Sequence, residues 1–187
     1  QMLVNKGQIV EDSLRLGADR SVVVDVSSIH FSDEVRKYCE MNSCGKYGTN
    51  WSCPPGVGGV QELKKEADRY QKGLLLQTIH NLKSPLDYRG MMEGKKRHNE
   101  VLCKDFNYVS KEHGLEETLM LSAGACEVCK KCSYLEGNPC PFPKKAIASL
   151  EAYGIDVIQL TKTYDIPYHS GKDTVTYVGL ILFKDSI

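Results

Sequence analysis

The stretch Thr174-Val-Thr-Tyr-Val-Gly-Leu-Ile-Leu-Phe183 contains the longest apolar run of the chain and predicts a buried β-strand. The residues of this stretch are apolar or β-branched, which suits a strand packed on a core. The apolar run from Tyr177 to Phe183 is much shorter than the roughly 18 residues that a membrane-spanning helix needs. We therefore expect the chain to fold around a sheet that includes residues 174–183.

Working outward from this strand, apolar patterns and turn residues predict the other elements. Further strands are expected at Ser21–Val26, Gly73–His80 and Glu117–Leu121, while Asp156–Leu160 is ambiguous. Helices are expected over 5–17, from Ser32 or Asp33 through Tyr38, over Gln61–Tyr70, from about Leu86 to His113, and over Lys144–Tyr153. The pattern predicts an α+β fold in one domain, residues 1–187, with a compact sheet of four or five strands, flanking helices and two cysteine-rich loops.

The composition is that of an ordinary globular protein, with 187 residues, 41% hydrophobic and 26% charged. The 24 basic and 24 acidic side chains balance to a net charge of zero, which argues against bulk binding of nucleic acid. No stretch predicts a membrane span, and no basic segment followed by an apolar one predicts a signal peptide. We therefore expect a cytoplasmic protein without a nucleic-acid or membrane partner.

The eight cysteines are the most informative residues of the chain. They fall into two groups and one isolated position: Cys39, Cys44 and Cys53; then Cys103; then Cys126, Cys129, Cys132 and Cys140. The chain is long enough to build a core without disulfides, and this uneven spread does not suit a disulfide framework. Clustered cysteines in a chain without a signal peptide indicate metal binding.

The second group is the stronger signal. Its pattern is Cys126-x2-Cys129-x2-Cys132-x7-Cys140-Pro141. Bacterial ferredoxins share the run of three cysteines followed by Cys-Pro, with a shorter gap of about three residues before the last cysteine. The sequence predicts a 4Fe–4S cluster here, with zinc or plain structural cysteines as the alternatives.

The first group predicts a second metal site. Its pattern is Cys39-x4-Cys44-x8-Cys53-Pro54-Pro55. Gly45 and Gly48 allow positive φ angles, so the backbone can wrap closely around a bound group and direct N–H groups at its sulfurs. Trp51 is expected to shield this site from water, which would tune its potential.

Three segments resemble a prokaryotic domain-of-unknown-function family described as predicted metal-binding proteins. They are Cys44-Gly-Lys-Tyr-Gly-Thr-Asn-Trp-Ser-Cys-Pro-Pro55, Gly124-Ala-Cys-Glu-Val-Cys-Lys-Lys-Cys132 and Ser149-Leu-Glu-Ala-Tyr-Gly-Ile-Asp-Val157. The resemblance runs from about Val35 to Leu182 and implies a small metal or iron–sulfur protein of anaerobic bacteria and archaea. It implies metal binding by the seven cysteines of the two groups, but no particular reaction. Cys103 lies outside these motifs.

Two 4Fe–4S clusters need eight ligands, and the chain has eight cysteines. In a local arrangement Cys140 completes its own group and Cys103 serves the first group. In a swapped arrangement Cys140 serves the first group and Cys103 the second. If Cys103 is instead a small buried hydrophobe, the usual role of a lone free cysteine, one cluster keeps an iron without a protein ligand.

Three functions follow from these readings. The first is electron transfer from 4Fe–4S clusters to a redox partner protein, with Lys46, Lys130 and Lys131 either offsetting cluster charge or simply solvated. The second is an iron–sulfur enzyme whose open iron binds a small molecule, with Glu151 either a nearby proton donor or a plain surface carboxylate. The third is a structural zinc module. No catalytic residue is assigned, and the sequence does not indicate an oligomeric state.

Overall fold

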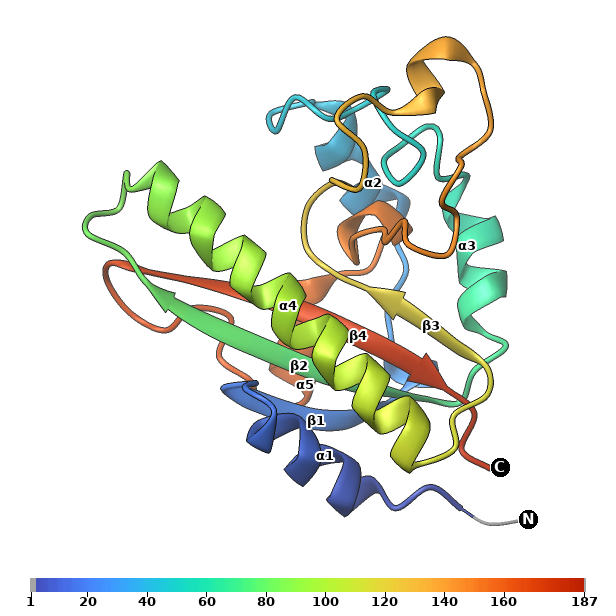
Figure 1. Cartoon of the computed structure of the whole chain (residues 1–187), viewed down its shortest axis with the longest axis vertical. Coiled ribbons are helices and arrows are strands. Elements are labelled where there is room, and N and C mark those ends of the chain that lie inside the picture. The colour runs from blue at the N-terminus through green and yellow to red at the C-terminus, as the bar shows by residue number, and fades with distance from the viewer. Residues whose placement is uncertain (1–2, 187) are drawn as a thin grey trace.

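The computed structural model describes residues 3–186, and its elements run in an order that mixes helices and strands (Figure 1). The helices are α1 (Lys6–Arg15), α2 (Asp33–Glu40), α3 (Val60–Ala67), α4 (Tyr88–Glu112) and α5 (Val157–Thr163), with short 3₁₀ turns η1 (Val26–Ser28), η2 (Ser133–Glu136) and η3 (Glu151–Tyr153). The strands are β1 (Arg20–Asp25), β2 (Lys72–Asn81), β3 (Thr118–Leu121) and β4 (Thr174–Phe183).

The four strands form one antiparallel sheet in the order β1-β2-β4-β3, which confirms the predicted α+β class. β2 and β4 pair along their whole length, from Lys72 opposite Phe183 to Asn81 opposite Thr174. β3 is much shorter and pairs only with residues 180–183 of β4. From Thr174 to Gly179, the edge of β4 that faces away from β2 therefore has no strand beside it within the part of the chain that the structure describes.

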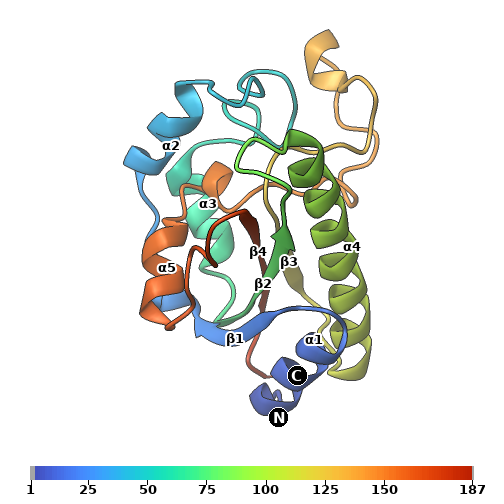
Figure 2. The ribbon, with the colours of Figure 1, turned by 90° about the vertical axis from the view of Figure 1, so that its left-hand side faces the viewer.

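Helices cover both faces of the sheet, which Figure 2 shows edge-on between them. Because side chains alternate along a strand, β4 serves two cores. Leu180 and Leu182 pack into a core with residues of α3, η3 and α5, while Ile181 and Phe183 pack into another with residues of α1 and α4. This explains the continuous apolar run of the sequence, since both faces of β4 are buried.

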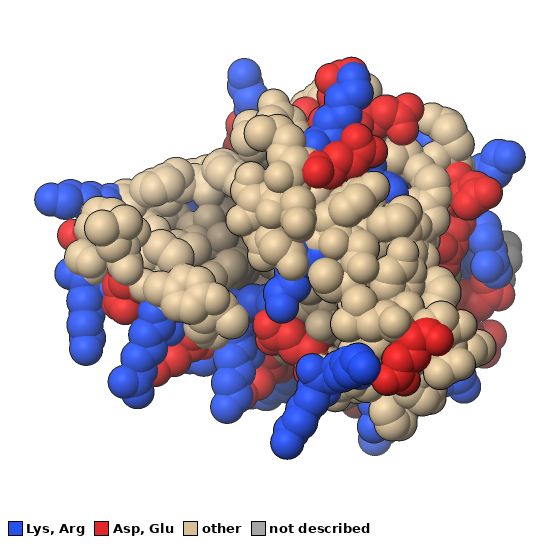
Figure 3. Space-filling view, turned by 90° about the horizontal axis from the view of Figure 1, so that it is seen from above, with Lys and Arg blue, Asp and Glu red and all other residues tan. Residues whose placement is uncertain are grey.

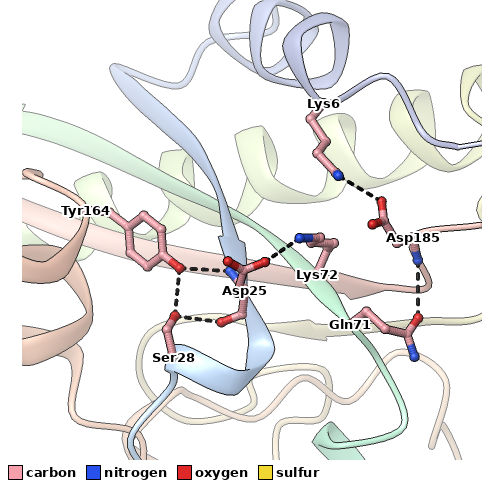
Figure 4. Close-up of polar contacts among 7 residues, drawn as sticks. All are labelled: Lys6, Asp25, Ser28, Gln71, Lys72, Tyr164 and Asp185. Carbon is pink, nitrogen blue, oxygen red and sulfur yellow. Dashed lines mark hydrogen bonds and ion pairs between the residues drawn. The ribbon is translucent and has the colours of Figure 1, made fainter.

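Figure 4 shows polar contacts between helices and strands near β1 and near the two ends of the described chain. The Tyr164 hydroxyl, just after α5, accepts a hydrogen bond from the backbone N–H of Asp25 at 2.8 Å and lies 2.7 Å from the Ser28 hydroxyl. Lys6 Nζ lies 3.2 Å from the carboxylate of Asp185. These contacts connect the end of α5 to β1 and α1 to the segment that follows β4.

Most predicted elements are confirmed, but the helix predicted over Lys144–Tyr153 is wrong. Only η3 is helical there, and the ambiguous stretch that follows forms α5. Ser149 instead makes a parallel bridge with Ser122, whose backbone N–H donates to the carbonyl of Ala148 and whose carbonyl accepts from Leu150. These bonds to a distant segment draw the backbone into an extended path. Gly154, directly after η3, has a positive φ of 76°.

α4 carries an uncharacteristically buried carboxyl, Asp105, with no exposed surface. One of its oxygens accepts a hydrogen bond from the Ser13 hydroxyl of α1, and the other has no hydrogen-bond partner among the described residues. Burial raises the pKa of Asp105 to about 6, against a usual value of 3.8. The folded state therefore binds more protons than the unfolded state between about pH 4 and 6, and this carboxyl lowers stability as the pH rises through that interval.

Asp105→Asn is expected to raise the free energy of unfolding by about 2–3 kcal/mol at pH 7.5 and by little at pH 4. The amide oxygen can keep the bond from Ser13 while the charge is removed. Thermal unfolding of variant and wild type at both pH values tests this, with an expected gain of roughly 5–10 °C at pH 7.5. Comparing the two proteins at each pH is necessary because buried His98, whose pKa burial lowers to about 4, acts in the opposite direction. A variant that melts lower than wild type at pH 7.5 would contradict the prediction.

Candidate metal centre

The two cysteine-bearing segments lie side by side at one end of the molecule, around α2 and η2 (Figures 1 and 2). Trp51 of the first segment donates from Nε1 to the backbone carbonyl of Asn138 at 3.0 Å. Its ring packs edge-on against Tyr134 of the second segment, with 4.9 Å between ring centroids. A Cβ atom on Gly56 would come within 2.8 Å of the Tyr134 ring, so the loops approach each other as closely as only glycine permits.

Four cysteines of the second segment line one small cavity, and we call them the quartet: Cys126, Cys129, Cys132 and Cys140. All four are half-buried free thiols. Cys140 thus lies with the three cysteines that precede it, as in the local arrangement. Trp51 and Phe142 line the same cavity. Trp51 therefore shields the quartet rather than the first group, contrary to the expectation from its position in the sequence.

The remaining three grouped cysteines, here the trio of Cys39, Cys44 and Cys53, line a second and larger cavity of about 680 Å³. Cys39 is on α2 and the other two are on the irregular loop that follows it, in which Gly45 and Gly48 have the expected positive φ angles of 71° and 67°. Burial raises the pKa of the Cys39 and Cys53 thiols, and neighbouring thiols add to the shift. Metal binding at the trio would therefore release protons.

Arg36 links the segments that carry the trio, and no sequence pattern predicted this role. From α2 its guanidinium donates to the carbonyl of Ala152 at 3.0 Å and to that of Gly58 at 2.8 Å. It thereby joins the helix that carries Cys39 to η3 and to the loop after Cys53. In the sequence, this residue is one more charged side chain on a short polar helix.

Glu151 also faces the 680 Å³ cavity. Solvent reaches its side chain through the cavity, yet protein atoms surround it, and this burial raises the pKa of the carboxyl. Burial, with a smaller contribution from the Glu151 charge, also raises the pKa of Cys39 and of Tyr168, so the carboxyl lies near both. Glu151 therefore lies beside the first site and is also exposed to solvent, which fits both readings of this carboxylate.

Cys103 belongs to neither group by position. It is half-buried on α4 and lines a separate cavity with Asn99, Gly124 and Cys126. It is thus only partly buried, and it does not line the cavity of the trio. The trio has no fourth cysteine among the residues around its cavity.

Cys103→Ser is expected to leave the metal content and the visible spectrum unchanged, because the thiol lies away from the trio and the quartet already has four cysteines. Iron and sulfide analysis of the variant, prepared beside the wild type without oxygen, tests this. A loss of about four irons would instead make Cys103 a ligand and remove the open position at the trio.

The donors are cysteine thiols, which suit a soft metal ion or an iron–sulfur cluster. Within residues 3–186, no three Cys, His, Asp or Glu side chains converge closely enough to hold one metal ion. Tetrahedral zinc requires four ligands within about 2.0–2.3 Å of a common point. A 4Fe–4S cluster binds each thiolate through a different iron, so thiols spread around a cavity suit it.

Comparisons with known proteins agree with a metal-binding role. The sequence model of a family described as predicted metal-binding protein (DUF2284) matches residues 22–183. No curated protein matches the chain. A crystal structure of epoxyqueuosine reductase with a tRNA-Tyr epoxyqueuosine-modified tRNA stem loop shares 8% identity, with a TM-score of 0.41. The match covers 94% of this chain but 44% of that one, and similarity at this level does not establish a common fold.

A search of the described residues for a helix with the length and apolar character of a membrane span finds none.

Proposed function

Since this chain belongs to the family of predicted metal-binding proteins (DUF2284), we propose that it is an iron–sulfur redox protein with two 4Fe–4S clusters, one at the quartet and one at the trio. The observation that carries this proposal is the gathering of Cys126, Cys129, Cys132 and Cys140 around one cavity. When bound, the clusters supply one-electron transfer. The residues of the chain hold them, limit their access to water and admit the molecules that exchange electrons with them.

The quartet is suited to exchange with a redox partner protein. Two large apolar side chains that line its cavity are exposed, Val128 by 44% and Phe142 by 45%. Exposed apolar side chains grouped on a surface are typical of protein contact sites. Trp51 also lines the cavity, and shielding from water influences the potential of a cluster.

The trio is suited to a different task, and this supports the second candidate function, an enzyme that acts on a small molecule. Its three cysteines leave one iron of a 4Fe–4S cluster without a cysteine ligand, and they face a cavity large enough for a small organic molecule. Electrons would then enter at the quartet and be used at the trio. A protein that only carries electrons has no need of such a cavity.

The test is to measure iron, acid-labile sulfide and zinc per chain on protein purified without oxygen. About eight irons and eight sulfides per chain, the content of two 4Fe–4S clusters, would support the proposal. About four of each would limit it to one cluster. Near-stoichiometric zinc without sulfide would overturn it and leave a structural zinc module.

A further inference from the structure

The 680 Å³ cavity lies where β3 stops short of β4. Because β3 pairs only with residues 180–183, the edge of β4 at Thr176–Val178 faces the cavity instead of another strand. An unpaired strand edge presents backbone N–H and C=O groups that can bind a ligand. Opposite this edge are the cysteine-bearing loop, η3 and the start of α4, and Figure 3 shows this end of the molecule hollowed, with mostly uncharged walls.

Large side chains that are not packed against the core surround this cavity. Tyr88 is 72% exposed, Tyr168 49% and Met92 38%, and all three line it. Tyrosine rings offer flat faces on which another ring can stack. A volume of about 680 Å³ is within the roughly 300–1,000 Å³ that ligand sites occupy.

Four Lys and Glu side chains line the cavity, and two of them, Lys46 and Glu151, have no ion pair among the described residues. Lys95 and Glu127 pair with each other at 3.1 Å, so their charges cancel. Glu151 has no ion pair among the described residues, although it faces the same space. With the edge of β4, it gives the cavity hydrogen-bonding groups at its inner end and aromatic rings elsewhere.

We propose that this cavity binds a small planar aromatic molecule that carries a carboxamide or similar donor–acceptor pair. The ring lies against Tyr88 and Tyr168, and the polar group bonds with the edge of β4 and with Glu151, beside the trio. As a substrate site the proposal rests on the proposed function, because the trio would supply the electrons. Binding itself requires only the cavity.

Benzamide is a suitable probe, and cyclohexanecarboxamide is its control because it has the same amide on a ring that is not flat. Saturation-transfer NMR on protein purified without oxygen is expected to give a Kd for benzamide in the low millimolar range, as suits a molecule of this size. The control compound is expected to bind at least fivefold more weakly. Equal binding of the two compounds, or no binding of benzamide, would overturn the proposal.

Variants locate the site. Tyr88→Ala and Tyr168→Ala are each expected to weaken benzamide binding at least threefold, whereas Tyr38→Ala, at a tyrosine that is also 72% exposed but does not line the cavity, leaves it unchanged. Glu151→Leu weakens it while Glu151→Gln, which keeps hydrogen-bonding groups, retains most of it. Equal effects at Tyr38 and Tyr88 would mean surface binding only and would overturn the proposal.

Iron and sulfide measured on the same samples distinguish a failure of the binding-site proposal from a failure of the proposed iron–sulfur function. Eight irons without benzamide binding would remove the inference and leave the proposed function standing. Benzamide binding by a zinc-containing or sulfide-free protein would keep the site and remove the proposed function.

Discussion

Cys129→Ser is expected to remove about four irons and four sulfides per chain, half of the content of two 4Fe–4S clusters, and about half of the visible absorption. Cys129 is the middle cysteine of the closely spaced run and lines the cavity together with the other three of the quartet. A serine hydroxyl is a harder and weaker ligand for iron than a thiolate. The trio has its own supports in α2 and Arg36, so its cluster should remain.

The matched variant is Cys44→Ser, at the most exposed cysteine of the trio, which is expected to remove the other half. Cys103→Ser is the control that keeps all of the iron. Metal and sulfide analysis of the three variants, prepared together without oxygen, gives the result directly. If Cys129→Ser retained the full iron content, the quartet would not be a cluster site.

Arg36→Met is expected to empty the trio without touching any cysteine. The substitution removes the donors to the carbonyls of Ala152 and Gly58, and hydrogen bonds from a charged group contribute about 1.5–3 kcal/mol each. α2, and with it Cys39, would lose its connection to η3 and to the loop after Cys53. We expect a loss of about four irons per chain and a fall in Tm of roughly 6–12 °C.

Arg89→Met is the matched control for Arg36→Met. The Arg89 side chain is 90% exposed and pairs only with Glu93 on the same helix, so iron content and Tm should stay within error of wild type. Full iron content and an unchanged Tm in Arg36→Met would show that the hydrogen bonds of Arg36 are not needed to hold the trio.

The fold was predictable where local sequence decides structure. Both ends of β4 match the predicted strand because its residues are apolar or β-branched throughout, and α4 differs from its predicted range by one or two residues. The segment 144–153 was not predictable in this way. Its extended path depends on hydrogen bonds to Ser122, more than twenty residues away, and no local pattern records them.

The same distinction applies to the two cysteine sites. The grouping of the quartet follows from spacing, since its four cysteines lie within fifteen residues. The residues around the trio could not be predicted from spacing, because they come from α2, α4, η3 and β4 together. Trp51 was assigned to the wrong site for the same reason: its partners, Tyr134 and Asn138, belong to the other loop.

The position of β4 between β2 and β3 determines the order in which the sheet can form and the cysteines can bind metal. Every cysteine precedes residue 141, so all eight leave the ribosome before β4, which begins at Thr174. Until β4 inserts, β2 and β3 have no strand between them, and the sheet that supports the two cysteine-bearing segments is incomplete. Iron loading is therefore expected to follow the emergence of β4 from the ribosome, and nascent chains arrested before β4 should bind no clusters.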